Sequence, residues 1–399
     1  MIQDTHHQVD QLLLEQGEYL PLELLLQEGR LSYSDYEAWR NGKFDCLDEV
    51  VFGDPMQILQ QLQQAGAYLI QRDWLAETIS YLSWNSDTPQ TLRFSRNITL
   101  NNDFHLRYRK PQDQPQLDMF TDAPAANLAN GIRQALVDRN TAEARRQIER
   151  LYDIAPNHIQ LGALEHLVEA AERLPSAVDD IASEMQTLRD TLTPLAESIM
   201  GSQCRNLLVP LWRRLSEALR GQSYQPAHPQ QHISYTATQA IDWDVVQKAV
   251  EQEDAWQNEA VLLLRHALAC EPLHQTAAAL QSWFALCWQF PEQSDAIDCS
   301  TRQEFLQQWQ TFLDLEPELP PQSFPAWYLI GKPGLTKLLP TPGDALIAPP
   351  ASYCTLYQLQ TRQTDMQTRG KIENDDITLR ALLKQQDAEL FRYFLHNSQ

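Results

Sequence analysis

The stretch TAEARRQIERLYDIAPNHIQ, residues 141–160, is the part of the sequence that decides the fold class. Four apolar residues recur in it at the spacing of one helical face: Ala144, Ile148, Leu151 and Ala155. The APNH that follows ends the helix with a proline. Helical patterns of similar length precede it over 123–140 and follow it over 159–174. Paired helices with short connections favour helical hairpins stacked side by side.

The segment from Ala125 to Leu174 resembles tetratricopeptide-type units in helix length and in its APNH turn. The Trp, Gly and Tyr positions usual in that repeat are missing, and no strict 34-residue period is present. The resemblance implies a helical-hairpin array that is tetratricopeptide-like.

The N-terminal region predicts short helices. LPLELLLQEGRLSYSDYEAWRNGKF, residues 20–44, predicts one helix that ends near Gly29 and a second that begins at a Ser32 or Ser34 cap. A further helix is expected after Asp54, which would cap it, with a proline in its first turn.

The pattern then changes from helix to strand. In TLRFSRNITLNNDFHLRYRK, residues 91–110, apolar and polar side chains alternate near the end, and NN supplies a turn. We therefore expect a β-hairpin, within a small N-terminal α+β module of a mainly α protein. This region resembles a small helix-plus-hairpin module of uncharacterised bacterial proteins, which implies a bacterial source and no particular activity.

The expected hairpin also carries a basic patch in an otherwise acidic chain. Its members are Arg93, Arg96, Arg107, Arg109 and Lys110. Two interpretations are open. The arginines solubilise an edge strand, or they contact phosphates beside Phe94 and Tyr108.

Composition shifts divide the 399 residues into regions. We expect an N-terminal module over 1–110, a Pro- and Gln-rich linker over 111–124, a helical-hairpin lobe over 125–220 and a Trp-rich helical lobe over 233–399. Nine prolines fall within 317–350, so that segment is predicted to cross the last lobe without being one regular helix.

The formal charge of −22 disfavours nucleic acid or an anionic membrane as a general partner. The richest apolar run, AVLLLRHALA, is broken by Arg265 and His266, and the first residues lack the pattern of a signal peptide. Six scattered cysteines without a CxxC pair suggest reduced, structural thiols. We expect a cytoplasmic protein.

Motifs for chemistry are missing from the sequence: it has no GxSxG, no Gly-rich phosphate loop and no HExxH. His266, Cys270 and His274 have the spacing of one helical face, but Pro272 interrupts that helix. Acidic clusters such as ENDD, residues 373–376, suit solvated helix ends as well as they suit catalysis. We expect no catalytic residue, no metal ion and no cofactor.

Seven of the ten tryptophans lie between Trp212 and Trp327. Around Trp283 and Trp288 the sequence is apolar on most sides of a helix, so this helix is either central in its lobe or covered by a partner. Both tryptophans are candidates for contact with a partner protein.

The linker contains an apolar peptide, QLDMF, formed by Gln116, Leu117, Asp118, Met119 and Phe120. Two apolar anchors beside an amide suit a partner with neighbouring pockets. The peptide resembles the one by which bacterial replication and repair proteins bind the sliding clamp, which implies that partner. In the other interpretation, Met119 and Phe120 pack at the entrance of the helix that follows.

We therefore expect a non-enzymatic adaptor that acts through protein–protein contacts. The alternative is an accessory factor of DNA replication, repair or defence that the sliding clamp recruits and whose basic residues contact nucleic acid.

Overall fold

The computed structural model describes residues 2–84, 90–110, 122–366 and 374–397. These residues are mainly helical, as the sequence predicts, and include a small antiparallel sheet of three strands. The chain forms two compact units. The first contains residues 1–218 and 239–241, and the second contains residues 219–238 and 242–399.

The first unit holds the N-terminal module and the helical-hairpin lobe together. Its helices are α1 (Ile2–Gln16), α2 (Pro21–Gln27), α3 (Tyr33–Arg40), α4 (Pro55–Ile70), α5 (Ile98–Phe104), α6 (Asp122–Val137), α7 (Thr141–Ile154), α8 (Leu161–Glu172), α9 (Ile181–Thr187), α10 (Thr193–Met200) and α11 (Arg205–Ala218). Its strands are β1 (Glu18–Tyr19), β2 (Leu75–Thr78) and β3 (Leu106–Arg109). Shorter helical turns are η1 (Leu47–Glu49), η2 (Leu188–Leu192) and η3 (Gly201–Cys204).

Two helix starts agree with the sequence. Ser32 caps α3 by accepting a hydrogen bond from the backbone N–H of Asp35 at 3.0 Å. Asp54 caps α4 in the same way, with the backbone N–H of Met56 as donor at 3.2 Å. Gly29 follows α2 at a φ of +67°, a left-handed conformation that glycine adopts without steric cost.

The predicted β-hairpin over residues 91–110 is wrong, because its expected turn lies inside α5. The side chain of Asn97 accepts hydrogen bonds from the backbone N–H groups of Thr99 and Leu100, at 3.0 and 3.3 Å. This cap starts a helix at the position of the expected turn, whereas the alternation after the turn is confirmed as the strand β3.

The strand β3 is the centre of the sheet, with β1 on one side and β2 on the other. Tyr108 pairs with Tyr19 of β1 and with Ala76 of β2, both antiparallel. The interpretation that Arg107 and Arg109 solubilise an edge strand is therefore wrong. Both partner strands lie far away in the sequence, so no local pattern predicts that they pair with β3.

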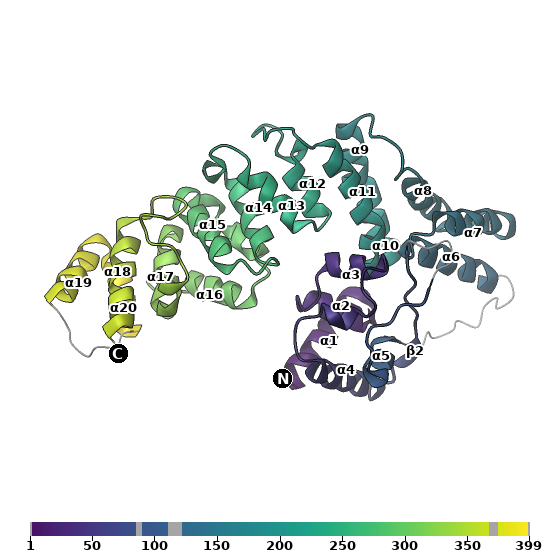
Figure 1. Ribbon diagram of the computed structural model, residues 1–399, viewed down its shortest axis with the longest axis horizontal. Coiled ribbons are helices and arrows are strands. Elements are labelled where there is room, and N and C mark those ends of the chain that lie inside the picture. Colours follow the sequence, from purple (N-terminus) through teal and green to yellow (C-terminus); the bar gives the residue numbers. More distant parts are fainter. Residues whose placement is uncertain (1, 85–89, 111–121, 367–373, 398–399) are drawn as a thin grey trace. The chain divides into compact units, whose positions relative to one another are not determined.

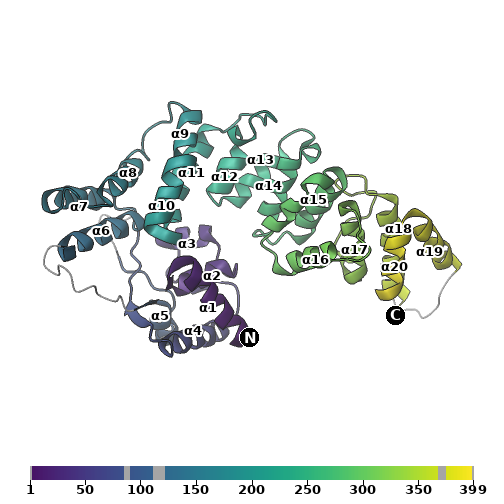
Figure 2. The same cartoon turned by 180° about the vertical axis from the view of Figure 1, so that it is seen from behind.

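The helices α6, α7 and α8 form a packed group in the same unit, and Figures 1 and 2 show them beside one another. The predicted apolar face of α7 is confirmed, since Ala144, Ile148 and Leu151 are buried. The proline of APNH follows the end of this helix, as predicted.

The second unit is a run of helices. They are α12 (Ile233–Gln239), α13 (Trp243–Glu251), α14 (Ala260–Cys270), α15 (Thr276–Gln289), α16 (Gln303–Leu313), α17 (Phe324–Gly331), α18 (Ala351–Met366), α19 (Asn374–Gln386) and α20 (Ala388–Asn397). Short 3₁₀ turns are η4 (Pro229–Gln231), η5 (Trp256–Asn258), η6 (Pro291–Cys299), η7 (Pro321–Ser323) and η8 (Pro333–Lys337). Neighbours in the sequence pack against one another, as α13 does on α14 and α14 on α15.

Two features of the second unit add detail to what the sequence predicts. The Pro-rich segment 317–350 contains the buried helix α17, whose Phe324 and Leu329 are fully enclosed in the core. The last two helices, α19 and α20, are separate, because the side chain of Asp387 accepts a hydrogen bond from the backbone N–H of Leu390 at 2.9 Å and starts α20.

Within the described part of the chain, no helix combines the length and the apolar character that a membrane crossing requires.

Candidate functional site

The peptide QLDMF, Gln116–Phe120, lies outside the described residues. The elements on either side of it are described. The strand β3 ends at Arg109 and α6 begins at Asp122, and both belong to the first unit. The peptide is therefore attached at both ends to the same compact unit.

Trp283 lies in the core of the second unit. Its side chain is 1% exposed, and its indole Nε1 donates a hydrogen bond to Glu271 at 2.9 Å. Trp283 is therefore a core residue, which is the first of the two roles that its sequence allows. Trp288 is half-buried and packs edge-on against Tyr353, with 4.9 Å between the ring centroids.

The basic residues of the N-terminal module are mostly engaged with acids. Arg107 and Arg109 both donate to one carboxylate oxygen of Glu77, at 2.6 and 2.7 Å. Arg96 lies 3.5 Å from Glu49 and is strongly exposed. These ion pairs reduce the positive potential that the five residues present to solvent.

Two further members of the basic patch contact other groups or solvent. Lys110 lies over the ring of Trp74, with 5.7 Å from Nζ to the ring centroid. Arg93 has an exposed side chain, while its backbone carbonyl accepts a hydrogen bond from Trp39.

A cluster in the second unit has the residue types of a nucleophilic site, but its His266, Cys270 and Ser282 are buried. His266 hydrogen-bonds Ser282 at 2.7 Å through Nδ1 and Glu251 at 3.1 Å through Nε2. Burial lowers the pKa of His266 and raises the pKa of the neighbouring Cys270 thiol to about 12. The cluster ties α13, α14 and α15 together. α14 ends at Cys270, two residues before Pro272, as the sequence predicts.

Among the described residues, no group of three or more His, Cys, Asp or Glu side chains is arranged to hold a metal ion.

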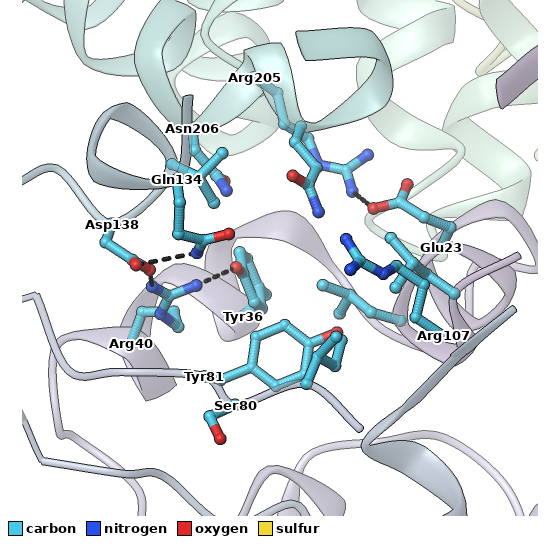
Figure 3. A pocket seen from close by; sticks show the side chains of 15 residues that line it. Glu23, Tyr36, Arg40, Ser80, Tyr81, Arg107, Gln134, Asp138, Arg205 and Asn206 are labelled. Carbon is cyan, nitrogen blue, oxygen red and sulfur yellow. Dashed lines mark hydrogen bonds and ion pairs between the residues drawn. The ribbon is translucent and has the colours of Figure 1, made fainter. Parts of the chain in front are cut away.

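A polar cavity inside the first unit is the candidate site (Figure 3). Its volume is about 40 Å³, and it is partly open to solvent. Its walls come from many separate segments: Leu20, Leu22, Glu23, Tyr36, Arg40, Ile79, Ser80, Tyr81, Arg107, Gln134, Val137, Asp138, Gln203, Arg205 and Asn206. Three arginines and two acids line it, so its wall carries one excess positive charge.

Arg40 forms one wall of the cavity and is 1% exposed. Its guanidinium donates to the carbonyl of Leu82 at 2.7 Å, to the hydroxyl of Tyr36 at 2.6 Å and to Asp138 at 2.5 Å. It also lies over the ring of Trp84, 4.6 Å from the centroid. Each of its three nitrogens donates a hydrogen bond to a partner, so Arg40 organises the wall.

Arg205 and Glu23 form a second ion pair in the wall, shown as a dashed line in Figure 3. Burial disfavours the charged form of Arg205, but the adjacent Glu23 outweighs this effect and raises the pKa of the guanidinium. Glu23 is 3% exposed and lies in the first turn of α2, where the helix dipole favours a negative charge.

A neighbouring network fixes α3 beside the cavity. Arg213 of α11 binds both carboxylate oxygens of Glu37, at 3.0 and 2.8 Å, and Arg139 binds the same group at 2.7 Å. Burial acts to raise the pKa of Glu37, but these two arginines overcome it and hold the pKa below its usual range. The segment that carries Tyr36 and Arg40 is therefore held rigidly in place.

Among the residues that line this cavity, only Arg107 is a candidate site residue on sequence grounds. The ion pairs Arg40–Asp138 and Arg205–Glu23 join positions about 100 or more residues apart, as do the contacts of Glu37. The i, i+4 spacing of Tyr36 and Arg40 on α3 is the one local signal that could have indicated a polar wall.

Comparison with known proteins gave no match to a family model, a curated protein or a solved structure.

Proposed function

We propose that this chain is a non-enzymatic adaptor that acts through protein–protein contacts. The proposal is supported by the role of its chemically reactive side chains. His266, Cys270 and Ser282 are buried and join helices of the second unit to one another. Side chains used in this way stabilise a scaffold, and the exposed surface is left for partners.

The observation that carries the proposal is the peptide Gln116–Phe120 and its attachment between β3 and α6. Leu117 and Phe120 supply two apolar anchors, and the amide of Gln116 supplies a polar contact at the rim of a pocket. The resemblance to the clamp-binding peptide makes the bacterial sliding clamp the partner to test, and we propose a bacterial cytoplasm as the location of the protein.

We also propose that α6, α7 and α8 form a tetratricopeptide-like hairpin group. Each of the three contacts the other two, and α7 carries an apolar face toward its neighbours. At the turn between α7 and α8, Ile154 and Ile159 are 50% and 95% exposed. Trp288 of the second unit remains the other candidate contact.

The first test uses a synthetic peptide of residues 111–124 and a purified bacterial sliding clamp. We expect micromolar binding by calorimetry. A peptide with Leu117→Ala and Phe120→Ala should bind at least about 30-fold more weakly, because each truncated anchor costs on the order of 1 kcal/mol or more. A control peptide with Gln112→Ala and Gln114→Ala should bind like the original. Equal binding by all three peptides would contradict the assignment.

The second candidate function is a clamp-recruited accessory factor in DNA replication, repair or defence. The exposed side chains of Arg93 and Arg96 favour it, because exposed guanidinium groups can reach phosphates. Arg107 and Arg109 support it less, since both are held by Glu77.

This second candidate predicts weak binding to duplex DNA that falls steeply with salt. Arg93→Glu with Arg96→Glu should weaken it at least about 10-fold at low salt, because two phosphate contacts are replaced by repulsion. Arg146→Glu on α7 is the matched control, since Arg146 is equally exposed but lies outside the basic patch. DNA binding that is absent, or that all variants retain, would leave the adaptor as the proposed function.

A further inference from the structure

Three polar atoms of the cavity wall are buried and hydrogen-bond no described residue. They are the Nε of Arg107, the Nε of Arg205 and the hydroxyl of Tyr81. Buried polar groups are paired in the great majority of cases, so three such atoms on one small cavity require an explanation. Tyr81 is 6% exposed, so solvent does not satisfy its hydroxyl.

All three atoms act as hydrogen-bond donors. A guanidinium N–H has no lone pair to offer and can only donate. Burial, the largest effect on Tyr81, and the nearby Tyr36 and Glu23 raise its pKa far above the usual value, so its hydroxyl stays protonated. A group that satisfies all three must therefore supply acceptor atoms.

The donors come from different elements, and all three residues line the same cavity. Arg107 lies on β3, Arg205 begins α11, and Tyr81 follows β2. Tyr81 lies within electrostatic range of Glu23, Arg40 and Arg205. Figure 3 shows the guanidinium of Arg107 between the side chains of Tyr81 and Arg205.

The acids in the wall do not exclude an anion, because both already have cationic partners. Glu23 is paired with Arg205, and Asp138 accepts hydrogen bonds from Arg40 and from Gln134 at 2.5 and 2.9 Å. Arg107 is the third cation, and its partner Glu77 lies outside the lining and is shared with Arg109.

We propose that this cavity binds a small oxyanion group, a phosphate or a carboxylate, through Arg107, Arg205 and Tyr81. Arginine is suited to both groups, because its planar array of N–H donors matches two oxygens at once. Ser80, Gln203 and Asn206 line the same space and offer further polar contacts. The anion would tie the central strand of the sheet to α11.

The test is calorimetric titration of the full chain with inorganic phosphate and, separately, with acetate, at constant ionic strength. We expect one site per chain for one or both anions. Stronger binding of phosphate would indicate a tetrahedral dianion as the ligand, and stronger binding of acetate would indicate a carboxylate.

Tyr81→Phe is the decisive variant, because it removes only the unpartnered hydroxyl. The melting temperature without anion should stay unchanged, while the affinity for the anion should fall about 5-fold, the effect of one lost hydrogen bond. Arg107→Gln should weaken binding about 10-fold or more, and the fold should tolerate it because Glu77 keeps Arg109.

Tyr19→Phe is the matched control. Tyr19 is also buried in the first unit with an unpartnered hydroxyl, but it does not line the cavity. Its affinity for the anion should stay within about 2-fold of the wild type. The proposal is overturned if neither anion binds the wild type at one site, or if Tyr81→Phe and Arg107→Gln bind as well as Tyr19→Phe does.

Discussion

Replacing Arg40 by methionine should lower the free energy of unfolding of the first unit by about 3–5 kcal/mol. The side chain is 1% exposed and satisfies the carboxylate of Asp138, the hydroxyl of Tyr36 and the carbonyl of Leu82. Methionine keeps the apolar length of the side chain but leaves the nearly buried Asp138 without its cation. Urea unfolding of the full chain, followed by circular dichroism, measures the loss.

Two comparisons show whether the stability is lost because the carboxylate of Asp138 is left without its cation. Adding Asp138→Asn to Arg40→Met should restore a large part of the stability, because no uncompensated carboxylate is left. Arg146→Met removes an exposed arginine from an ion pair with Glu143 and should leave the urea midpoint nearly unchanged. If Arg40→Met cost no more than Arg146→Met, the cavity wall would not depend on Arg40.

Glu271→Ala should destabilise the second unit by a similar amount, about 3–5 kcal/mol. The carboxyl group of Glu271 accepts four hydrogen bonds, from Trp283, from Ser300 and from the backbone and side chain of Thr301, at 2.6–2.9 Å. Truncation leaves the buried indole of Trp283 and the buried hydroxyl of Ser300 without an acceptor, and it removes the acceptor of both Thr301 donors. It also releases the loop before α16 from the end of α14.

Glu271→Gln separates the loss of the charge from the loss of the side chain. The amide keeps one acceptor oxygen but turns an NH₂ group toward existing donors, so we expect an intermediate loss of about 1.5–3 kcal/mol. The control is Glu304→Gln, whose side chain is 69% exposed and paired with Lys332. It should change stability by no more than about 1 kcal/mol. Equal melting temperatures for Glu271→Ala and the wild type would refute the structural role.

The parts of the fold that the sequence predicted correctly depend on local chemistry. The cap of Ser32 on α3, the cap of Asp54 on α4 and the apolar face of α7 all act within a few residues. The predicted β-hairpin is wrong because two local signals compete, a helix cap and an alternation of apolar residues. The capping side chain of Asn97 started a helix that the alternation of apolar residues did not reveal.

The sheet and the cavity could not be predicted because their contacts are distant in the sequence. β3 pairs with strands at residues 18–19 and 75–78. The cavity gathers side chains from residue 20 to residue 206. Arg107 was singled out for its charge alone, and its contact with Glu77 follows from the register of β2 against β3.

We propose that the chain docks onto a partner through Leu117 and Phe120. The most direct measurement is the affinity of the full chain for a bacterial sliding clamp, for the wild type and for Leu117→Ala with Phe120→Ala, with both melting temperatures recorded. We expect micromolar binding that the double variant loses while its melting temperature is unchanged. No binding by the wild type, together with a double variant that melts several degrees lower, would contradict it and identify both side chains as part of the core.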